Sequence, residues 1–298
     1  MTPPALSSLA GLFGEMNDLK RIRRAGDPRS LAGALFARSW AALVAGDEPR
    51  EVALAAAAQA VASARLGGID AGVLARCGLG ERAALAVLGR SFDAVAGPLD
   101  PGLAGELRAR LGRPWPEAGA PGFGAALAEQ PRAGPTCPGK PRIVLEPPES
   151  HAEHCMLVAA YAVLVSPLYG AEPADGLMLG MAHHFHNVVL PDAGFAGEEL
   201  LGDELLPVMR RLTAEVVESL PRPLGPDLAE LLPLLEGAER PASRAFHAAD
   251  VIDRVIQVRQ YARAASFTVD QALDDLELVH AGPVQAFHFE VLREAGLP

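Results

Sequence analysis

Residues 148–170, PESHAEHCMLVAAYAVLVSPLYG, decide the fold class of this chain. After the Pro-Glu-Ser start, the stretch stays apolar for longer than a strand normally runs. It also lacks the strict alternation of apolar and polar residues that a half-buried strand would show. These residues therefore predict a long helix.

The same helical pattern continues on both sides of this stretch, and no sustained alternation interrupts it. The sequence therefore predicts an all-α fold. On the N-terminal side, helices are expected over residues 30–46, 50–69, 74–79, 81–97 and 100–112. On the C-terminal side, they are expected over 174–189, 203–221, 227–239 and 242–266, followed by a helical tail.

Residues 112–141 differ from their surroundings because they are rich in proline and glycine, which cannot sustain a long helix. We interpret them as a linker between two helical domains, divided near residue 135. The predicted organisation is an N-terminal helical domain over 1–111, the linker, and a second helical domain over 142–298. The first domain could also be a decayed copy of the second.

Composition excludes several classes of protein. Half of the residues are hydrophobic, so the chain can bury a core, and its net charge of -11 disfavours nucleic acid or an anionic membrane as a partner. The first 24 residues place an apolar run before a basic cluster, the reverse of a secretory signal. We therefore expect a cytoplasmic protein. The three cysteines have no CxxC spacing and predict neither a disulfide framework nor a zinc knuckle.

All eight histidines lie beyond residue 135, so any chemistry is expected there. Three separate helices each offer side chains spaced three residues apart, which places them on one helix face. Imidazoles and carboxylates that converge from rigid helices suit a transition metal. The three sets are His151 with His154, His183 with His186, and His247 with Asp250 and Asp253.

The order of three segments resembles the HD-domain metal-dependent phosphohydrolase superfamily, and within it the bacterial 5′-deoxynucleotidase-like branch. The segments are PRIVLEPPESHAEHC (141–155), LGMAHHFHNVVLPD (179–192) and AADVIDRVIQVRQY (248–261). The resemblance covers about residues 140–265, and PESHAEHC is its most specific part. It implies that the second domain is an HD-type helical bundle.

The resemblance also implies roles for individual residues. His154 falls on the first metal-binding histidine, His183 on the histidine of the HD pair, and Asp250 on the final metal-binding aspartate. Arg142 falls on the arginine that contacts substrate phosphate in such enzymes. Asp192 falls on the aspartate that lies at their reaction centre.

The chain departs from the family pattern at His184, which stands where the family has the aspartate of the HD pair. A neutral imidazole cannot bridge two metals as a carboxylate can, so a single divalent ion (Mn, Fe, Co or Zn) is expected. Its predicted ligands are His154, His183, His184 and Asp250.

A second departure is Asn187, which stands where the family has a proton-shuttling glutamate. Asparagine has no titratable proton, so another residue must act as the general base. His186 and Asp192 are the candidates. On a continuous helix, residue 184 would point about 100° away from residues 183 and 186, so either His184 or His186 is expected to miss the site.

Three functions remain open at this stage. The first is a phosphohydrolase that acts on a small phosphorylated metabolite such as a nucleoside monophosphate. The second is a non-catalytic HD-fold protein that binds a protein partner or pairs two subunits, its activity lost with the two substitutions. The third is an iron oxygenase, because some HD-fold proteins with extra histidines around the metal have that activity. The basic cluster LKRIRR (19–24) receives no predicted function.

Overall fold

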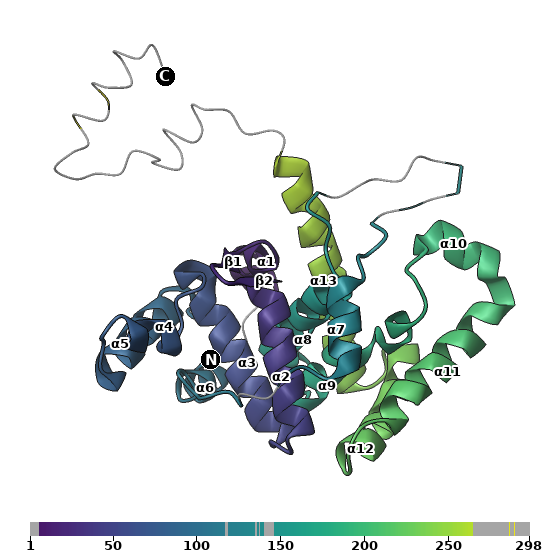
Figure 1. The fold of residues 1–298 in the computed structure, drawn as a ribbon, viewed down its shortest axis with the longest axis horizontal. Coiled ribbons are helices and arrows are strands. Elements are labelled where there is room, and N and C mark those ends of the chain that lie inside the picture. The colour runs from purple at the N-terminus through teal and green to yellow at the C-terminus, as the bar shows by residue number, and fades with distance from the viewer. Residues whose placement is uncertain are drawn as a thin grey trace. The chain divides into compact units, whose positions relative to one another are not determined.

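The described part of the chain is mostly helical, which confirms the predicted all-α class (Figure 1). The computed structural model describes residues 6–116, 119–134, 136, 138–139, 146–264, 286 and 289. Before residue 130 the elements are α1 (Leu6–Asn17), the 3₁₀ helix η1 (Asp18–Lys20), β1 (Arg23–Arg24), β2 (Asp27–Ser30), α2 (Leu31–Val44), α3 (Pro49–Leu66), α4 (Ala71–Arg76), α5 (Glu81–Val95), α6 (Pro101–Arg108) and α7 (Gly122–Glu129). After it they are α8 (His151–Tyr169), α9 (Pro173–Ala182), η2 (Phe185–Val188), α10 (Gly194–Leu201), η3 (Gly202–Glu204), α11 (Leu205–Glu218), α12 (Leu224–Leu231), η4 (Leu232–Glu236) and α13 (Pro241–Ala264).

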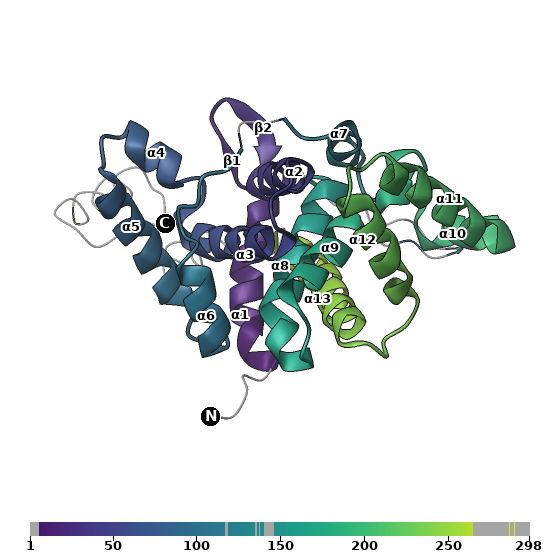
Figure 2. The same cartoon turned by 90° about the horizontal axis from the view of Figure 1, so that it is seen from below.

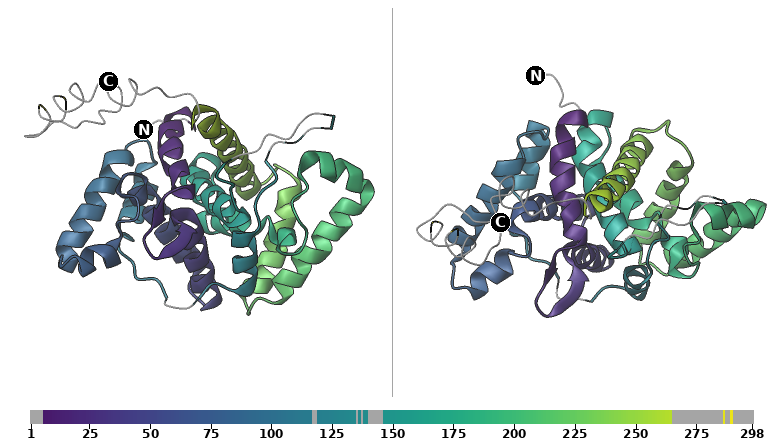
Figure 3. Two further views of the ribbon diagram at one scale, coloured as in Figure 1. Left: turned by 45° about the horizontal axis from the view of Figure 1, so that its top comes forward. Right: turned by 90° about the horizontal axis from the view of Figure 1, so that it is seen from above.

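Two helix pairs, α2 with α3 and α8 with α9, form the centre of the unit that runs to Ile256. Each pair packs against the other through α2 and α8 and through α3 and α9. Helices α4, α5 and α6 lie on one flank of this centre, and α10, α11 and α12 lie on the other (Figure 2). The same two flanks are visible from two further directions in Figure 3.

Two halves of the chain, α1 to α6 and α7 to α12, repeat one order of elements, and short sequences recur at equivalent places in them. A Pro-x-Ser triplet precedes both α2 and α8, a Glu-Pro pair begins both α3 and α9, and an Asp-Ala-Gly triplet leads into both α4 and α10. A Pro-Leu pair precedes α6 and opens α12. This correspondence between halves supplies equivalent positions for comparing their chemistry.

The recurring residues explain where the central helices begin. Ser30 and Ser150 are N-caps whose hydroxyls accept from backbone N–H groups, and at Ser150 the side chain of Glu153 completes a capping box. Pro49 and Pro173 occupy the first helical turn, where a missing N–H costs nothing. The cap at Ser150 fixes the turn that carries His151 and His154.

Helices α8 and α9 pack closely because small residues face each other. An ideal Cβ on Gly180 would lie 2.4 Å from the Cα of Ala159, and one on Gly176 would lie 3.1 Å from the carbonyl carbon of Ala162. Backbone atoms cannot move aside as a flexible side chain can. The two glycines therefore set the separation of the helices that hold the candidate site.

We predict that Gly180→Ala lowers the free energy of unfolding by about 3 kcal/mol, at the upper end of the usual cost of overpacking. Urea unfolding measures it. The matched control is Gly14→Ala in α1, where an added Cβ meets nothing within 4 Å; there alanine should stabilise the helix by up to about 1 kcal/mol. Equal effects of the two substitutions would contradict the close approach of α8 and α9.

The stretch predicted as a linker contains a helix, α7, which corrects that part of the prediction. Phe123 on α7 packs against Trp40 of α2 and Phe185 of η2, with ring centroids 5.1 Å and 5.2 Å apart. Proline and glycine limit this helix to eight residues, and burial of Phe123 and Leu127 against the core holds it in place. The segment is therefore packed structure between the two halves.

The chain to Ile256 forms one unit, and a second unit begins at Gln257. A single hydrophobic cluster of the first unit draws on residues from both sides of the predicted boundary near residue 135. Among the described residues, α8 is the one helix long and apolar enough to cross a membrane, and most of it is buried. Such burial is consistent with the core helix of a soluble protein. The predicted helical tail beyond residue 266 lies almost wholly outside the described residues.

Candidate metal centre

His154 is the central residue of the candidate site and is fully buried on α8. Its Nδ1 lies 2.7 Å from Oδ2 of Asp253, so the ring donates its Nδ1 proton to this carboxylate. Nε2 is left with a lone pair. It faces Nε2 of His183 at 3.2 Å and Oδ1 of Asp250 at 3.3 Å.

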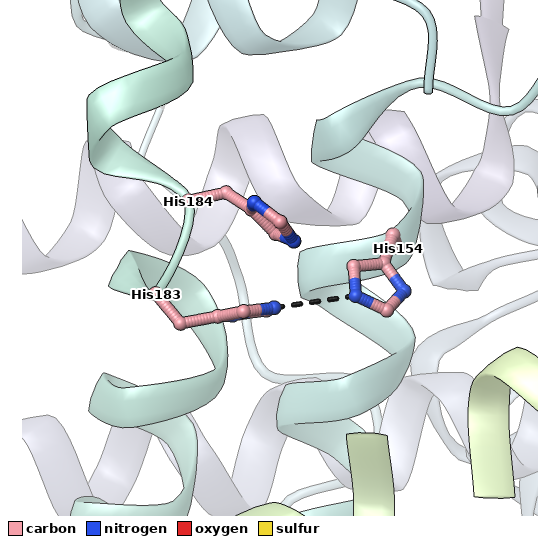
Figure 4. Close-up of side chains that lie close together, drawn as sticks. All are labelled: His154, His183 and His184. Carbon is pink, nitrogen blue, oxygen red and sulfur yellow. Dashed lines mark hydrogen bonds between the residues drawn. The ribbon is translucent and has the colours of Figure 1, made fainter. Parts of the chain in front are cut away.

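His183 and His184 both turn toward His154, although they are adjacent in the sequence (Figure 4). Helix α9 ends at Ala182, and His184 has φ −108° and ψ 22°, outside the helical region. The predicted helix over 174–189 is therefore too long. Because the backbone changes direction here, the expected 100° offset does not apply, and the rings of His183 and His184 lie 4.2 Å apart.

The two departures from the family pattern are hydrogen-bonded to each other. Nδ1 of His184 lies 2.7 Å from Oδ1 of Asn187, and the amide nitrogen of Asn187 donates to the carbonyl of Leu190 at 2.9 Å. Asn187 thereby fixes the ring of His184 and leaves Nε2 available. His183 is fixed similarly, since its Nδ1 donates to the carbonyl of Gly180 at 2.8 Å.

This donor set fits a divalent transition metal. One nitrogen atom from each of His154, His183 and His184 lies within 4.8 Å of the others. Donors bound at about 2.1 Å around one ion lie about 3.0–3.4 Å apart, a range that contains the two measured separations around His154 Nε2. The other nitrogen of each ring is held by a carboxylate, a carbonyl or an amide, as in metal sites with an ordered outer shell.

The facing nitrogens of His154 and His183 point most directly to a cation. Both rings donate their Nδ1 protons elsewhere, so two lone pairs face each other across 3.2 Å. This arrangement is repulsive unless a positive charge lies between them. A metal ion or a proton would satisfy both atoms.

The charge states suit metal binding. Burial, followed by the nearby ring of His154, lowers the pKa of His183 to about 3, and burial lowers the pKa of His184 well below its usual value. Both rings are therefore neutral at pH 7. Burial opposes the charged form of Asp250, but the contact with His154 and the positive charge of Arg254, whose Nη2 lies 3.1 Å from Oδ2, outweigh it and lower its pKa. The site thus offers three converging neutral imidazoles, and the carboxylate of Asp250 lies beside His154 but outside the group of three.

A second group of ligating residues, Glu149, His154 and Asp253, is already occupied by a cation. The buried ammonium of Lys20 lies 2.5 Å from Oε1 of Glu149 and 2.7 Å from Oδ2 of Asp253. The candidate metal position is therefore on the other face of His154.

Asp192 and His186, the predicted proton-transfer residues, lie beside the histidine cluster. The rings of His184 and His186 are 5.5 Å apart, and Asp192 accepts backbone N–H groups from Ala133 and Gly194. Burial lowers the pKa of His186 to about 4, against an opposing effect of Asp192. His186 is therefore neutral at pH 7 and able to accept a proton.

The sequence reasoning left His151 without a role, although its spacing to His154 is a signal that could have identified it. Its ring is fully buried 4.7 Å from the ring of His184, and its Nε2 lies 3.9 Å from Oδ2 of Asp192. Neither ring nitrogen has a hydrogen-bond partner. His151 therefore lies between the predicted metal ligands and Asp192 with unused hydrogen-bonding capacity.

Arg132 is a second residue that the sequence reasoning missed, because it falls in the stretch interpreted as a linker. Its Nη1 lies 3.3 Å from Oε2 of Glu149, and its charge helps to lower the pKa of both His151 and His183. Its buried Nε has no partner. The predicted phosphate-binding residue, Arg142, lies outside the described residues.

His247 shares its predicted helix face with Asp250 and Asp253, but its Nε2 lies 3.1 Å from the carbonyl of Gly237. It therefore serves as a control residue on the same helix. Asp253 also differs from a simple ligand, because one of its oxygens already contacts both His154 and Lys20.

The first half carries no equivalent donor set among its described residues. When the two halves are aligned at their matching helix starts, Ala34 on α2 is equivalent to His154 on α8. Gln59 on α3 is equivalent to His183, which directly follows α9. The space that Ala34 and Gln59 line has a volume of only about 20 Å³. Arg24 and Arg38, which also line it, both contact Oδ2 of Asp70. Within the described ranges, the donor set of the second half therefore has no counterpart at the equivalent position of the first half.

Comparison with known proteins adds no assignment to this geometry: no protein-family model, curated protein or solved structure matches the chain.

Proposed function

We propose that the chain is a diverged HD-domain phosphohydrolase that depends on a divalent metal and acts on a small phosphorylated metabolite such as a nucleoside monophosphate. The supporting observation is the pair of lone pairs on His154 and His183 that face each other across 3.2 Å. In this proposal the second half of the chain is an HD-type helical bundle, and the protein is cytoplasmic. Homodimer formation is part of the same proposal.

The metal would be held by His154, His183, His184 and Asp250. When bound, a divalent ion polarises a phosphoryl oxygen and makes water more acidic. Asn187 orients His184, and Gly180 orients His183, so both histidines are preorganised for this role.

The remaining residues bind substrate and move protons. Arg132 carries a partly buried guanidinium whose Nε is unpartnered, which suits a phosphate oxygen. Arg142 has the same role by the resemblance. Asp192 and His186 are the general-base candidates, because Asn187 cannot exchange a proton and its amide is already bonded to His184 and Leu190.

The test is release of phosphate from a panel of phosphomonoesters with added Mn, Fe, Co or Zn. We expect release that requires metal, disappears in His183→Ala and persists in His247→Ala. Arg132→Met should raise KM more than it lowers kcat, since it removes a phosphate contact but no metal ligand. Absence of release with every ion would overturn the catalytic assignment.

A non-catalytic HD-fold protein, which binds a small phosphorylated molecule or a protein partner, is the second candidate. The observation that favours it is the hydrogen bond between His184 and Asn187. These two neutral residues stand where the resemblance places two carboxylates. Metal bound without phosphate release from any substrate would support this candidate.

A further inference from the structure

We infer that Lys20 is a positioning residue for the metal centre, contributed by the N-terminal half of the chain. It acts through Asp253 on His154, the central metal ligand of the proposed function, on which this inference rests. The first half would thus be a working part of the site that the second half carries.

Three contacts define the position of Asp253. Its Oδ2 accepts from the ammonium of Lys20 at 2.7 Å and from Nδ1 of His154 at 2.7 Å, and its Oδ1 lies 3.4 Å from the amide nitrogen of Asn17. The side chains of Lys20 and Asp253 are 1% and 0% exposed. Two of the three partners therefore come from the end of α1 and from η1.

Helix α1 is itself anchored to α8, the helix that carries His154. The hydroxyl of Tyr161 donates to the carbonyl of Phe13 at 2.7 Å, and the two rings lie 4.4 Å apart. This contact places the turn after α1 beside the first turns of α8. The packing of α1 on α8 therefore holds Lys20 next to Asp253, and the buried side chain of Lys20 is itself enclosed by the fold.

The consequence for His154 is a fixed tautomer. A carboxylate that holds the Nδ1 proton leaves Nε2 as the metal-binding atom. Without the ammonium, Asp253 and Glu149 would be two buried carboxylates with too little compensating charge, and the hydrogen bond to His154 would lose its geometry. Lys20 thus maintains the acceptor that orients the ligand.

The correspondence of the two halves supports this role independently. Lys20 stands three positions after the last residue of α1, and Arg132 stands three positions after the last residue of α7. Both cations contact Glu149, through Oε1 and Oε2 respectively. Each half therefore contributes a cation from an equivalent position, and both cations lie beside the candidate metal centre.

The experiment uses full-length protein and compares Lys20→Met in two backgrounds. Lys20→Met alone should lose stability, because it leaves Glu149 and Asp253 uncompensated. Lys20→Met/Glu149→Gln removes one of these charges and should recover most of the free energy of unfolding. If Lys20 positions His154, this double variant should still bind manganese or zinc about 10–100-fold more weakly than Glu149→Gln alone.

A second readout needs no metal. The ¹⁵N shifts of His154 in metal-free protein should show the Nδ1–H tautomer in the wild type and in Glu149→Gln, and a mixture in the double variant. Arg108→Met, which breaks an exposed ion pair with Asp93, is the control and should change neither property. Equal metal affinity and equal tautomer in Glu149→Gln and the double variant would overturn the inference.

The two readouts separate this inference from the proposed function. A wild type that binds no metal contradicts the proposed metal centre, and the tautomer of His154 then decides the role of Lys20 by itself. A wild type that binds metal with an affinity insensitive to Lys20 contradicts only the present inference.

Discussion

His183→Ala is expected to reduce the metal content of the purified protein from about one ion per chain to near zero, because it removes a ligand from a site with four expected donors. The substitution deletes one of the two lone pairs that face each other across 3.2 Å. It leaves His154 with its bond to Asp253 and His184 with its bond to Asn187. The remaining donors keep their positions, so loss of metal would report the missing imidazole.

Elemental analysis measures this result on protein purified without a metal-affinity column. His247→Ala is the matched control, because His247 lies one turn from Asp250 but contacts the carbonyl of Gly237. Metal retained in His183→Ala, or lost equally in both variants, would contradict the assigned ligands. A wild type that takes up no manganese, iron, cobalt or zinc would make the histidine cluster a remnant of a site.

The sequence predicted the fold class because helical periodicity depends on local spacing, whereas the expected ligand positions came from the resemblance. A three-residue separation places His151 and His154 on one face of α8, and the apolar stretch around them predicts the buried helix. The predicted starts of α2, α3 and α9 at residues 30, 50 and 174 also lie one residue from the observed starts. Such features are encoded within a few residues of where they act.

The features that the sequence could not predict depend on backbone direction and on contacts between distant segments. The end of α9 at Ala182 turns His184 toward His154, and no propensity argument placed that end. Lys20 reaches Glu149 from a segment 129 residues earlier in the chain, and Arg132 lies in a stretch whose composition predicts a linker.

The pair His184 and Asn187 shows why single substitutions are hard to interpret. Taken separately, each stands where the resemblance places a carboxylate, and each predicts weaker catalysis. In the structure the amide oxygen of Asn187 accepts the Nδ1 proton of His184. The two residues therefore form one unit that presents Nε2, and a double substitution is the appropriate test of either.

The metal-free protein should lose stability steeply between pH 6.5 and pH 4. Burial lowers the pKa of His151 and His183 to about 3 and that of His186 to about 4. In the unfolded chain the same groups titrate near 6.5, so below that pH the unfolded state binds more protons than the folded state. The free energy of unfolding is therefore highest above pH 6.5 and falls as the pH approaches the folded pKa values.

The expected loss of unfolding free energy at low pH is large. Each such histidine costs about 1.4 kcal/mol per pH unit below 6.5, or about 2 kcal/mol at pH 5. Three of them together approach about 6 kcal/mol, which is comparable with the whole stability of many domains. The lowered pKa of Asp250 acts in the same direction only below about 3.8, where the unfolded carboxyl begins to take up a proton.

Urea unfolding at pH 7.5 and pH 5 with a chelator present measures this loss, and His151→Leu assigns part of it to one residue. The ring of His151 is fully buried and neither nitrogen is hydrogen-bonded, so leucine removes a titrating group without breaking a bond. We expect the variant to lose about 2 kcal/mol less than the wild type between the two pH values. If His151→Leu has the slope of the wild type, the buried imidazole is not the acid-sensitive element, because its removal would then leave the proton uptake on unfolding unaltered.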